Sequence, residues 1–149
     1  MTHRNAHSVE VERPAGEVFP YLVESDKRLR WMGVLKQSKP VDDGPPREGS
    51  RYRDVFEDHG QRIELDAEVT VYRPPELLEV RLDAPRGFAA TSTSRLEERD
   101  GRTRVSVEIR TQYRSRVARL LGGVVTRHAQ KQLEADLAAL KALLEEADG

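Results

Sequence analysis

Two stretches of the chain alternate between apolar and polar residues, and they define the expected architecture. In residues 61–73 the apolar set is Ile63, Leu65, Ala67, Val69 and Val71. In residues 103–114 the corresponding set is Val105, Val107, Ile109, Thr111 and Tyr113. A period of two places alternate side chains on opposite faces of a strand. Both stretches therefore predict long strands with one face in a core and the other in water.

Shorter strands complete the sheet. Apolar residues and turn signals predict strands at 7–13, 34–41, 52–56, 78–82 and 88–97. Asp100-Gly101 lies between the strand at 88–97 and the strand at 103–114, and it is a strong signal for a tight hairpin. Strands joined mostly by short turns run antiparallel, so the seven strands predict one curved antiparallel sheet.

Helical spacing occurs in two regions. The first begins at Pro14 and continues in a second short helical turn that starts at Ser25 or Asp26. Pro20 falls inside the first turn, which predicts a kink or a restart there. The second region, 115–146, predicts one long helix, in which Gly122-Gly123 indicates a close neighbour or a bend. Its apolar stripe contains Val125, Ala129, Leu133, Leu137, Leu140 and Leu144.

The sheet has one dry face and the long helix has one dry stripe, so each must cover the other. The expected fold class is α+β. A curved seven-stranded antiparallel sheet would wrap around a long C-terminal helix, with two short helices after the first strand.

Composition narrows the functional classes. A length of 149 residues predicts a single domain, 1–149. A net charge of -1 argues against a general nucleic-acid-binding protein, and the absence of cysteine excludes thiol catalysis and Cys-based zinc sites. The longest apolar stretch, 120–125, is far shorter than the ~20 residues of a membrane-spanning helix, and no signal peptide is evident. We expect a cytoplasmic protein, either a monomer or a homodimer through a sheet edge.

Alternation assigns an inward face to the sheet, and this face supplies the candidate ligand-binding residues. Most of them are apolar, with a few hydrogen-bonding groups between them, as is typical of small-molecule pockets. The set consists of Tyr52, Asp54, Phe56, Leu65, Ala67, Val69, Leu78, Val80, Phe88, Ser92, Ser94, Val107, Ile109, Thr111 and Tyr113.

Asp54 is the most informative member of this set. A carboxylate that faces a dry interior is costly unless it is paired or protonated. Asp54 is therefore either a general base with a raised pKa or a structural group bonded near the strand end. The hydroxyls of Ser92 and Ser94 either hold a ligand carbonyl or relieve crowding, and those of Tyr52 and Tyr113 either meet a ligand or lie at the rim.

Three further candidates lie outside the strands. Trp31 either flanks the cavity entrance or packs in the core. Val125 and His128 lie on the long helix, where His128 either titrates near the mouth of the cavity or is an exposed histidine without a catalytic role. The arginines at 114, 116, 119 and 127 are either solvated or attract an anionic head group or a membrane surface.

No nucleophile elbow, zinc-protease, dinucleotide or phosphate-loop motif is present in the sequence. His3 and His7 are four residues apart, but no acidic ligand accompanies them. We therefore expect neither a metal nor a cofactor.

Three segments resemble the SRPBCC or START-like superfamily, in particular its polyketide cyclase/dehydrase-like branch. They are HSVEVERPAGEVFPYLVESDKRLRWM, STSRLEERDGRTRVSVEIR and HAQKQLEADLAALKALLEE, and together they extend over nearly the whole chain. The resemblance implies a helix-grip fold that encloses a cavity for a small hydrophobic or amphipathic molecule. Pro20 departs from the usual pattern of the first helix.

The family contains several functional classes, so three hypotheses remain. The first is a carrier that binds a lipid, a quinone or a polyketide-like molecule. The apolar lining and the lack of a nucleophile-base pair favour this hypothesis. The second is a cofactor-independent cyclase or aromatase in which Asp54, Tyr113 or a serine guides the reaction. The third is a protein-interaction module like the co-chaperone members of the superfamily.

Overall fold

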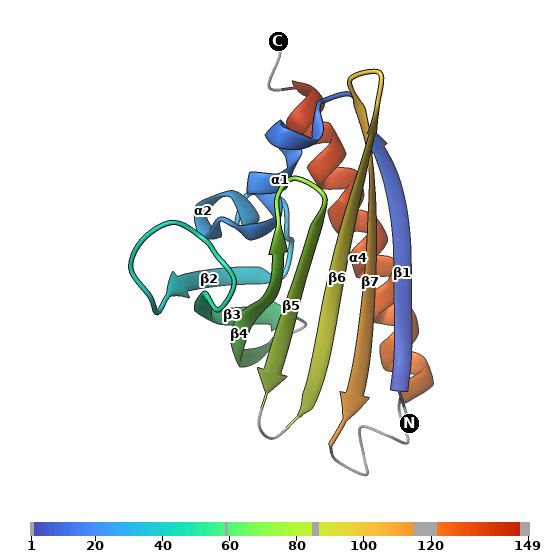
Figure 1. Cartoon of the computed structure of the whole chain (residues 1–149). Helices are drawn as coiled ribbons and strands as arrows, with labels where there is room; N and C mark the ends of the chain where they lie inside the picture. The colour runs from blue at the N-terminus through green and yellow to red at the C-terminus, as the bar shows by residue number, and fades with distance from the viewer. Residues whose placement is uncertain (1, 59, 85–86, 115–121, 147–149) are drawn as a thin grey trace.

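The computed structural model describes residues 2–58, 60–84, 87–114 and 122–146, and within them the sheet has seven strands. All neighbouring strands are antiparallel, in the order β1-β7-β6-β5-β4-β3-β2 (Figure 1). The strands are β1 Thr2–Val11, β2 Leu35–Pro40, β3 Arg51–Asp58, β4 Gln61–Arg73, β5 Leu77–Ala84, β6 Phe88–Arg99 and β7 Arg102–Tyr113. The fold class predicted from the sequence is confirmed.

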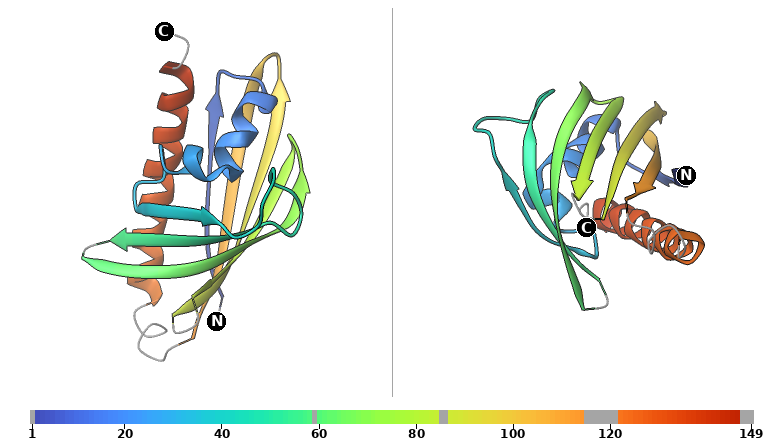
Figure 2. Two further views of the ribbon diagram at one scale, coloured as in Figure 1. Left: turned by 90° about the vertical axis from the view of Figure 1, so that its left-hand side faces the viewer. Right: turned by 90° about the horizontal axis from the view of Figure 1, so that it is seen from below.

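The two short helices follow β1 and lie on the concave side of the sheet, together with the C-terminal helix (Figure 2). They are α1 Ala15–Val23 and α2 Ser25–Arg28. Pro20 lies inside α1, and the Glu24 N–H donates to the Pro20 carbonyl at 2.9 Å where α1 ends. Helix α1 therefore continues past Pro20 to Val23, without the restart predicted at the proline, and α2 begins at Ser25, one of the two starts that the sequence predicts.

The C-terminal helix α4, Gly122–Glu146, runs along β1 on the concave side (Figures 1 and 2). Its apolar stripe is buried from Leu133 to Leu144, with Leu137 and Leu140 fully enclosed. The segment 115–121, which we also expected to be helical, lies outside the described residues.

The helix α4 also covers the free edge of β1. The side-chain amide of Gln130 accepts from the Ala6 N–H at 3.2 Å and donates to the Ala6 carbonyl at 2.8 Å. Further along, Lys141 donates to the Glu10 carbonyl at 2.7 Å. These side chains take the places that a neighbouring strand would occupy, so they block edge-to-edge pairing along much of β1.

The hairpin between β6 and β7 turns as the sequence predicts. Asp100 and Gly101 have φ values of 55° and 77°. Two consecutive positive φ values are typical of a type I′ turn, whose twist matches that of the flanking strands.

The upper half of the concave face, toward this hairpin, is a packed core. Helix α1 contributes Val18 and Phe19, and α4 contributes Leu137 and Leu140. They pack in one cluster with strand residues that include Val69, Leu78, Leu96, Val105 and Val107.

Two residues assigned to the inward face by alternation do not fit the buried pattern. A register shift between Val69 and Val71 interrupts the β4–β5 ladder, so Tyr72 pairs with the buried Leu78 and packs against Phe19 in place of Val71. Ile63 is 36% exposed, because it lies near the end of the β3–β4 hairpin, away from the packed core.

Candidate functional site

The lower half of the concave face is less completely covered than the packed core above it, although Val80, Leu82 and Ile109 also pack against that core. Strand register aligns Val80, Ser92 and Ile109 in one row across β5, β6 and β7. In the next row Leu82 stands beside Ala90. Val80, Leu82, Ser92 and Ile109 are only half-buried, whereas the large side chains of the upper rows are buried. This half of the face therefore retains apolar surface that solvent can reach.

Hydrogen-bonding groups lie among these apolar side chains. Ser94 and Thr111 are buried, and Ser92 is half-buried between Val80 and Ile109. Asn5 continues the row on β1, and its amide donates to the Gln130 side chain of α4 at 3.2 Å. The arrangement offers hydroxyls to a bound molecule inside an otherwise apolar wall.

Aromatic rings close the lower end of the face. The ring centroids of Phe88 and Tyr113 are 6.4 Å apart, and those of His3 and Tyr113 are 5.2 Å apart, both in edge-to-face contact. All three side chains are half-buried. They come from the ends of β6, β7 and β1, so they form one rim of the candidate site.

Most of the remaining apolar residues assigned to the lining are more deeply buried. Leu65 is buried on β4, and Phe56 on β3 is half-buried. Ala67, Val69, Leu78 and Val107 belong to the packed core cluster.

Asp54 is fully buried, and Arg28 of α2 is its partner. The Arg28 Nη2 lies 2.8 Å from Asp54 Oδ2, and Nη1 lies 3.4 Å from Oδ1. Arg28 is itself buried, and its Nη1 also donates to Ser38 Oγ at 3.2 Å. The cost of burying this carboxylate is thus offset by a buried cation, so the geometry gives Asp54 a structural partner and no access to solvent.

Arg28 was not anticipated from the sequence. The sequence does hold a signal for Arg28, because a buried carboxylate requires a cation as its partner. Arg28 is three residues from Ser25 and four from Met32, so these residues share one side of a helical turn. The 26-residue separation from Asp54 hides this pairing from any local pattern.

Tyr52 lies beside this pair and is buried. Burial raises the pKa of the Tyr52 phenol, while the nearby Arg28 acts in the opposite direction. The phenol therefore remains protonated at neutral pH, and its hydroxyl lies within hydrogen-bonding reach of the Ser50 side chain.

Trp31 packs in the core. Its ring belongs to the buried cluster, and its indole N–H donates to the Tyr21 carbonyl at 2.8 Å. This contact fixes the segment after α2 against α1.

His128 and Asp58 meet where the β3–β4 hairpin reaches α4. Nε2 of His128 lies 2.6 Å from Oδ2 of Asp58, and both side chains are partly exposed. Sequence reasoning placed His128 near a mouth but did not foresee this acidic partner. The side chain of Val125 lies outside the described residues.

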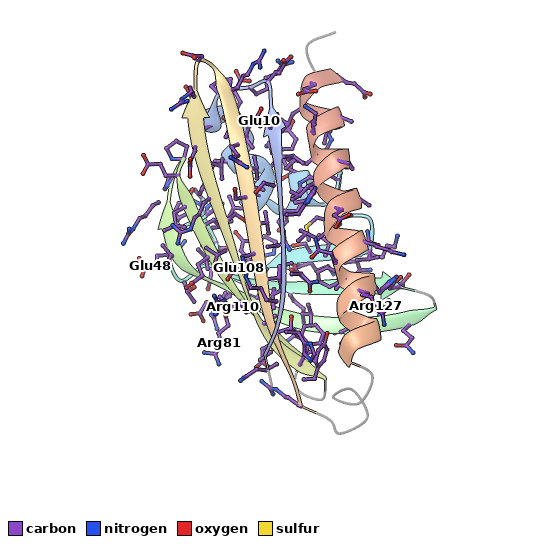
Figure 3. All side chains as sticks on the ribbon, turned by 90° about the vertical axis from the view of Figure 1, so that its right-hand side faces the viewer. Glu10, Glu48, Arg81, Glu108, Arg110 and Arg127 are labelled. Atoms are coloured by element: carbon purple, nitrogen blue, oxygen red, sulfur yellow. The ribbon has the colours of Figure 1, made fainter. Side chains whose placement is uncertain are left out.

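Two arginines of the arginine-rich region, Arg110 and Arg114, are engaged in ion pairs. Arg114 lies 2.6 Å from Asp83, and on the convex face Arg110 and Arg4 both bond to Glu108, which lowers the pKa of that carboxyl. Figure 3 shows Glu108 and Arg110 on the sheet and Arg127 on α4. Residues 116 and 119 lie outside the described residues.

A curved antiparallel sheet that grips a C-terminal helix, with an apolar and hydroxyl-bearing concave face, defines the helix-grip class of START-like proteins. Within that class, the chain belongs to the polyketide cyclase/dehydrase and lipid transport family, whose model matches residues 2–145. No curated protein matches the chain in sequence. Across the described ranges, no helix is long and apolar enough to cross a membrane.

Solved structures share this fold at low sequence identity. A START superfamily protein from Mycobacterium smegmatis is 18% identical, with 97% of this chain and 99% of that chain covered and a TM-score of 0.82. The Zhui aromatase/cyclase from Streptomyces sp. R1128 is 17% identical, with 100% and 97% covered and a TM-score of 0.81. The protein TTHA0849 from Thermus thermophilus is 14% identical, with 98% and 99% covered and a TM-score of 0.83.

Proposed function

We propose that the protein binds a small hydrophobic or amphipathic molecule against the lower half of the concave face. The observation that carries the proposal is the row formed by Val80, Ser92 and Ile109, which remains half-buried although it lies inside the curve of the sheet. When a ligand covers apolar surface in a concave site, that surface is removed from water, which favours binding. The hydroxyls of Ser92 and Thr111 would orient a polar group of that ligand.

Binding without turnover is favoured over cyclase chemistry. The best acid-base candidate, Asp54, has 0% of its surface exposed and is held by Arg28. A general base must reach the proton that it removes, directly or through one water. Aromatase/cyclases are among the structural neighbours, but at 17% identity the likeness concerns the fold.

Two substitutions at adjacent positions test this site. Ser92→Phe places a large ring in the centre of the row, where it would occupy the space of a ligand. Thr93→Phe is the matched control, because the next residue of β6 points to the convex face and is also half-buried. The two variants introduce the same side chain on opposite faces of one strand.

The measurement is native mass spectrometry of freshly purified protein, followed by titration with a panel of a fatty acid, a quinone and a polyphenol. We expect a co-purifying molecule or a panel ligand to bind the parent chain and the Thr93→Phe variant, and Ser92→Phe to weaken that binding at least tenfold. Equal binding by both variants, or no binding by any of the three proteins, would contradict the proposal.

A further inference from the structure

A pocket lies outside the concave face, between α2, the β2–β3 edge of the sheet and the connection at residues 41–50. Its volume is about 420 Å³. The region is visible beside α2 in Figure 1. Of the ligand-binding residues predicted from the sequence, only Tyr52 lines it. The lining residues are Glu24, Ser25, Asp26, Leu29, Ser38, Pro40, Asp42, Gly44, Pro46, Ser50, Arg51 and Tyr52.

The outer wall of this pocket is fixed by hydrogen bonds. At its start, Asp42 accepts from both the main-chain N–H and the guanidinium of Arg51, at 2.9 and 3.1 Å. At its end, the Gly49 N–H donates to the Val69 carbonyl of β4 at 2.8 Å, and Gly49 has a φ of 90° that suits glycine. The connection is thus tied to the sheet at both ends, which holds the outer wall of the pocket in place.

A chain of hydroxyls runs along one side of the pocket. Arg28 donates to Ser38 Oγ at 3.2 Å, and Ser38 Oγ lies 2.9 Å from Ser25 Oγ. Because Ser38 donates its proton to Ser25, the Ser25 hydroxyl keeps its own proton for another acceptor. Among the described residues, Ser25 Oγ donates no hydrogen bond of its own. A chain that starts at a guanidinium polarises its last hydroxyl and strengthens it as a donor.

The charges around the pocket leave one carboxylate unmatched. Arg28 is paired with Asp54, Arg51 with Asp42, and Lys27 with Glu24 at 2.9 Å. Asp26 lines the pocket, and within the part of the chain that the structure describes it has no ion-pair partner. The pocket therefore presents the Asp26 carboxylate to a ligand, with the ammonium group of Lys27 and the guanidinium of Arg47 in its surroundings.

The pocket also has an apolar wall. Leu29, Pro40 and Pro46 line it, and Leu29 is one of the few large apolar residues that stay exposed, at 40%. A ligand that covers Leu29 would remove this apolar surface from water.

We propose that this pocket binds a small amphipathic amine. Its ammonium group would lie at Asp26, an ether or carbonyl oxygen would accept from Ser25, and a compact apolar body would cover Leu29. This site is separate from the concave-face site and does not depend on it.

Three isosteric probes test the charge preference. They are 2-(cyclohexyloxy)ethylamine, which is a cation, 2-(cyclohexyloxy)ethanol, which is neutral, and cyclohexyloxyacetate, which is an anion. Each is titrated into ¹⁵N-labelled protein, and amide chemical shifts are followed at Ser25, Ser38 and Tyr52. The amides of Ser92 and Ile109 report on the concave face in the same spectra.

We expect the amine to shift the amides of Ser25, Ser38 and Tyr52. It should bind roughly fivefold more tightly than the alcohol, because it gains one partly exposed ion pair. The anion should bind most weakly. Asp26→Asn should reduce the amine to the affinity of the alcohol, whereas Asp66→Asn, which alters a carboxylate on the convex face of β4, should change nothing.

Equal affinity for the three probes, an unchanged affinity in Asp26→Asn, or shifts confined to Ser92 and Ile109 would overturn the proposal. The Ser92→Phe variant separates the two sites. It should bind the amine like the parent chain, whether or not the concave face binds a ligand.

Discussion

The buried pair of Arg28 and Asp54 makes the sharpest prediction about stability. Asp54→Asn preserves the size of the side chain and an oxygen that can still accept from Arg28, but it removes the negative charge. The guanidinium of Arg28 then stays buried without a counterion. The substitution therefore isolates the cost of an uncompensated charge from that of a cavity.

The size of the effect follows from burial and geometry. Asp54 has no exposed surface, and the shortest N–O distance of the pair is 2.8 Å. Removing one partner of such a pair costs roughly 3–5 kcal/mol, a large part of the ~5–15 kcal/mol that stabilises a typical domain. For a chain of this length, each kcal/mol lowers Tm by roughly 2–4 °C, so we expect Tm to fall by about 6–20 °C.

Urea unfolding, followed by far-UV circular dichroism and Trp31 fluorescence, measures the loss in free energy of unfolding. Thermal unfolding, followed by the same signals, measures the fall in Tm. The control is Asp66→Asn, which breaks a 3.5 Å pair with Arg53 whose carboxylate is 62% exposed. That loss should cost less than about 0.5 kcal/mol. Replacing both buried charges, in Arg28→Met with Asp54→Leu, should recover most of the stability, because no unpaired charge remains.

A cost below about 1 kcal/mol for Asp54→Asn would refute this reasoning. So would a double variant that is less stable than Asp54→Asn alone. Either result would mean that the pair is hydrated in solution and that Asp54 is available for other chemistry.

Two further predictions concern α4. Burial raises the pKa of Asp136 above its ordinary 3.8, while its bond to the Gly33 N–H partly opposes the shift. A raised pKa means that ionisation weakens the fold as pH rises, so Asp136→Asn should raise Tm at pH 7, and the difference should vanish below about pH 4; a lower Tm at pH 7 would contradict this. Gln130→Ala removes two bonds to the Ala6 main chain and should cost about 1–2 kcal/mol and speed hydrogen exchange at Ala6, whereas the exposed Lys131→Ala should do neither.

Much of the fold follows from the sequence because its signals are local. Alternation in residues 61–73 defines β4 to the residue, and Asp100-Gly101 defines the β6–β7 turn. The bulge after Val69 could not be predicted, since the apolar pattern continues through Val71 while the pairing partner on β5 changes. Local periodicity does not report the register of the neighbouring strand.

The candidate site could be predicted only in part. Parity along β6 and β7 predicts that Ser92 and Ile109 share one face of the sheet, and the strand register pairs them. It could not tell which rows would be filled, because that depends on how far α1 reaches down the sheet. Phe19 and Val18 fill the upper rows, and no pattern in the strands themselves records this.

The position of the short helix α2 determines the amine pocket but not the concave-face site. Four residues are too few to form a stable helix on their own, so its position depends on contacts with the rest of the chain. Arg28 ties it to β3, Ser25 ties it to β2 through Ser38, and Trp31 ties the following segment to α1. The amine pocket therefore depends on these tethers, whereas the row at Ser92 rests on the β5–β6–β7 ladders. Loss of the buried charge pair should thus impair the amine pocket first and leave the concave-face site in place as long as the sheet stays folded.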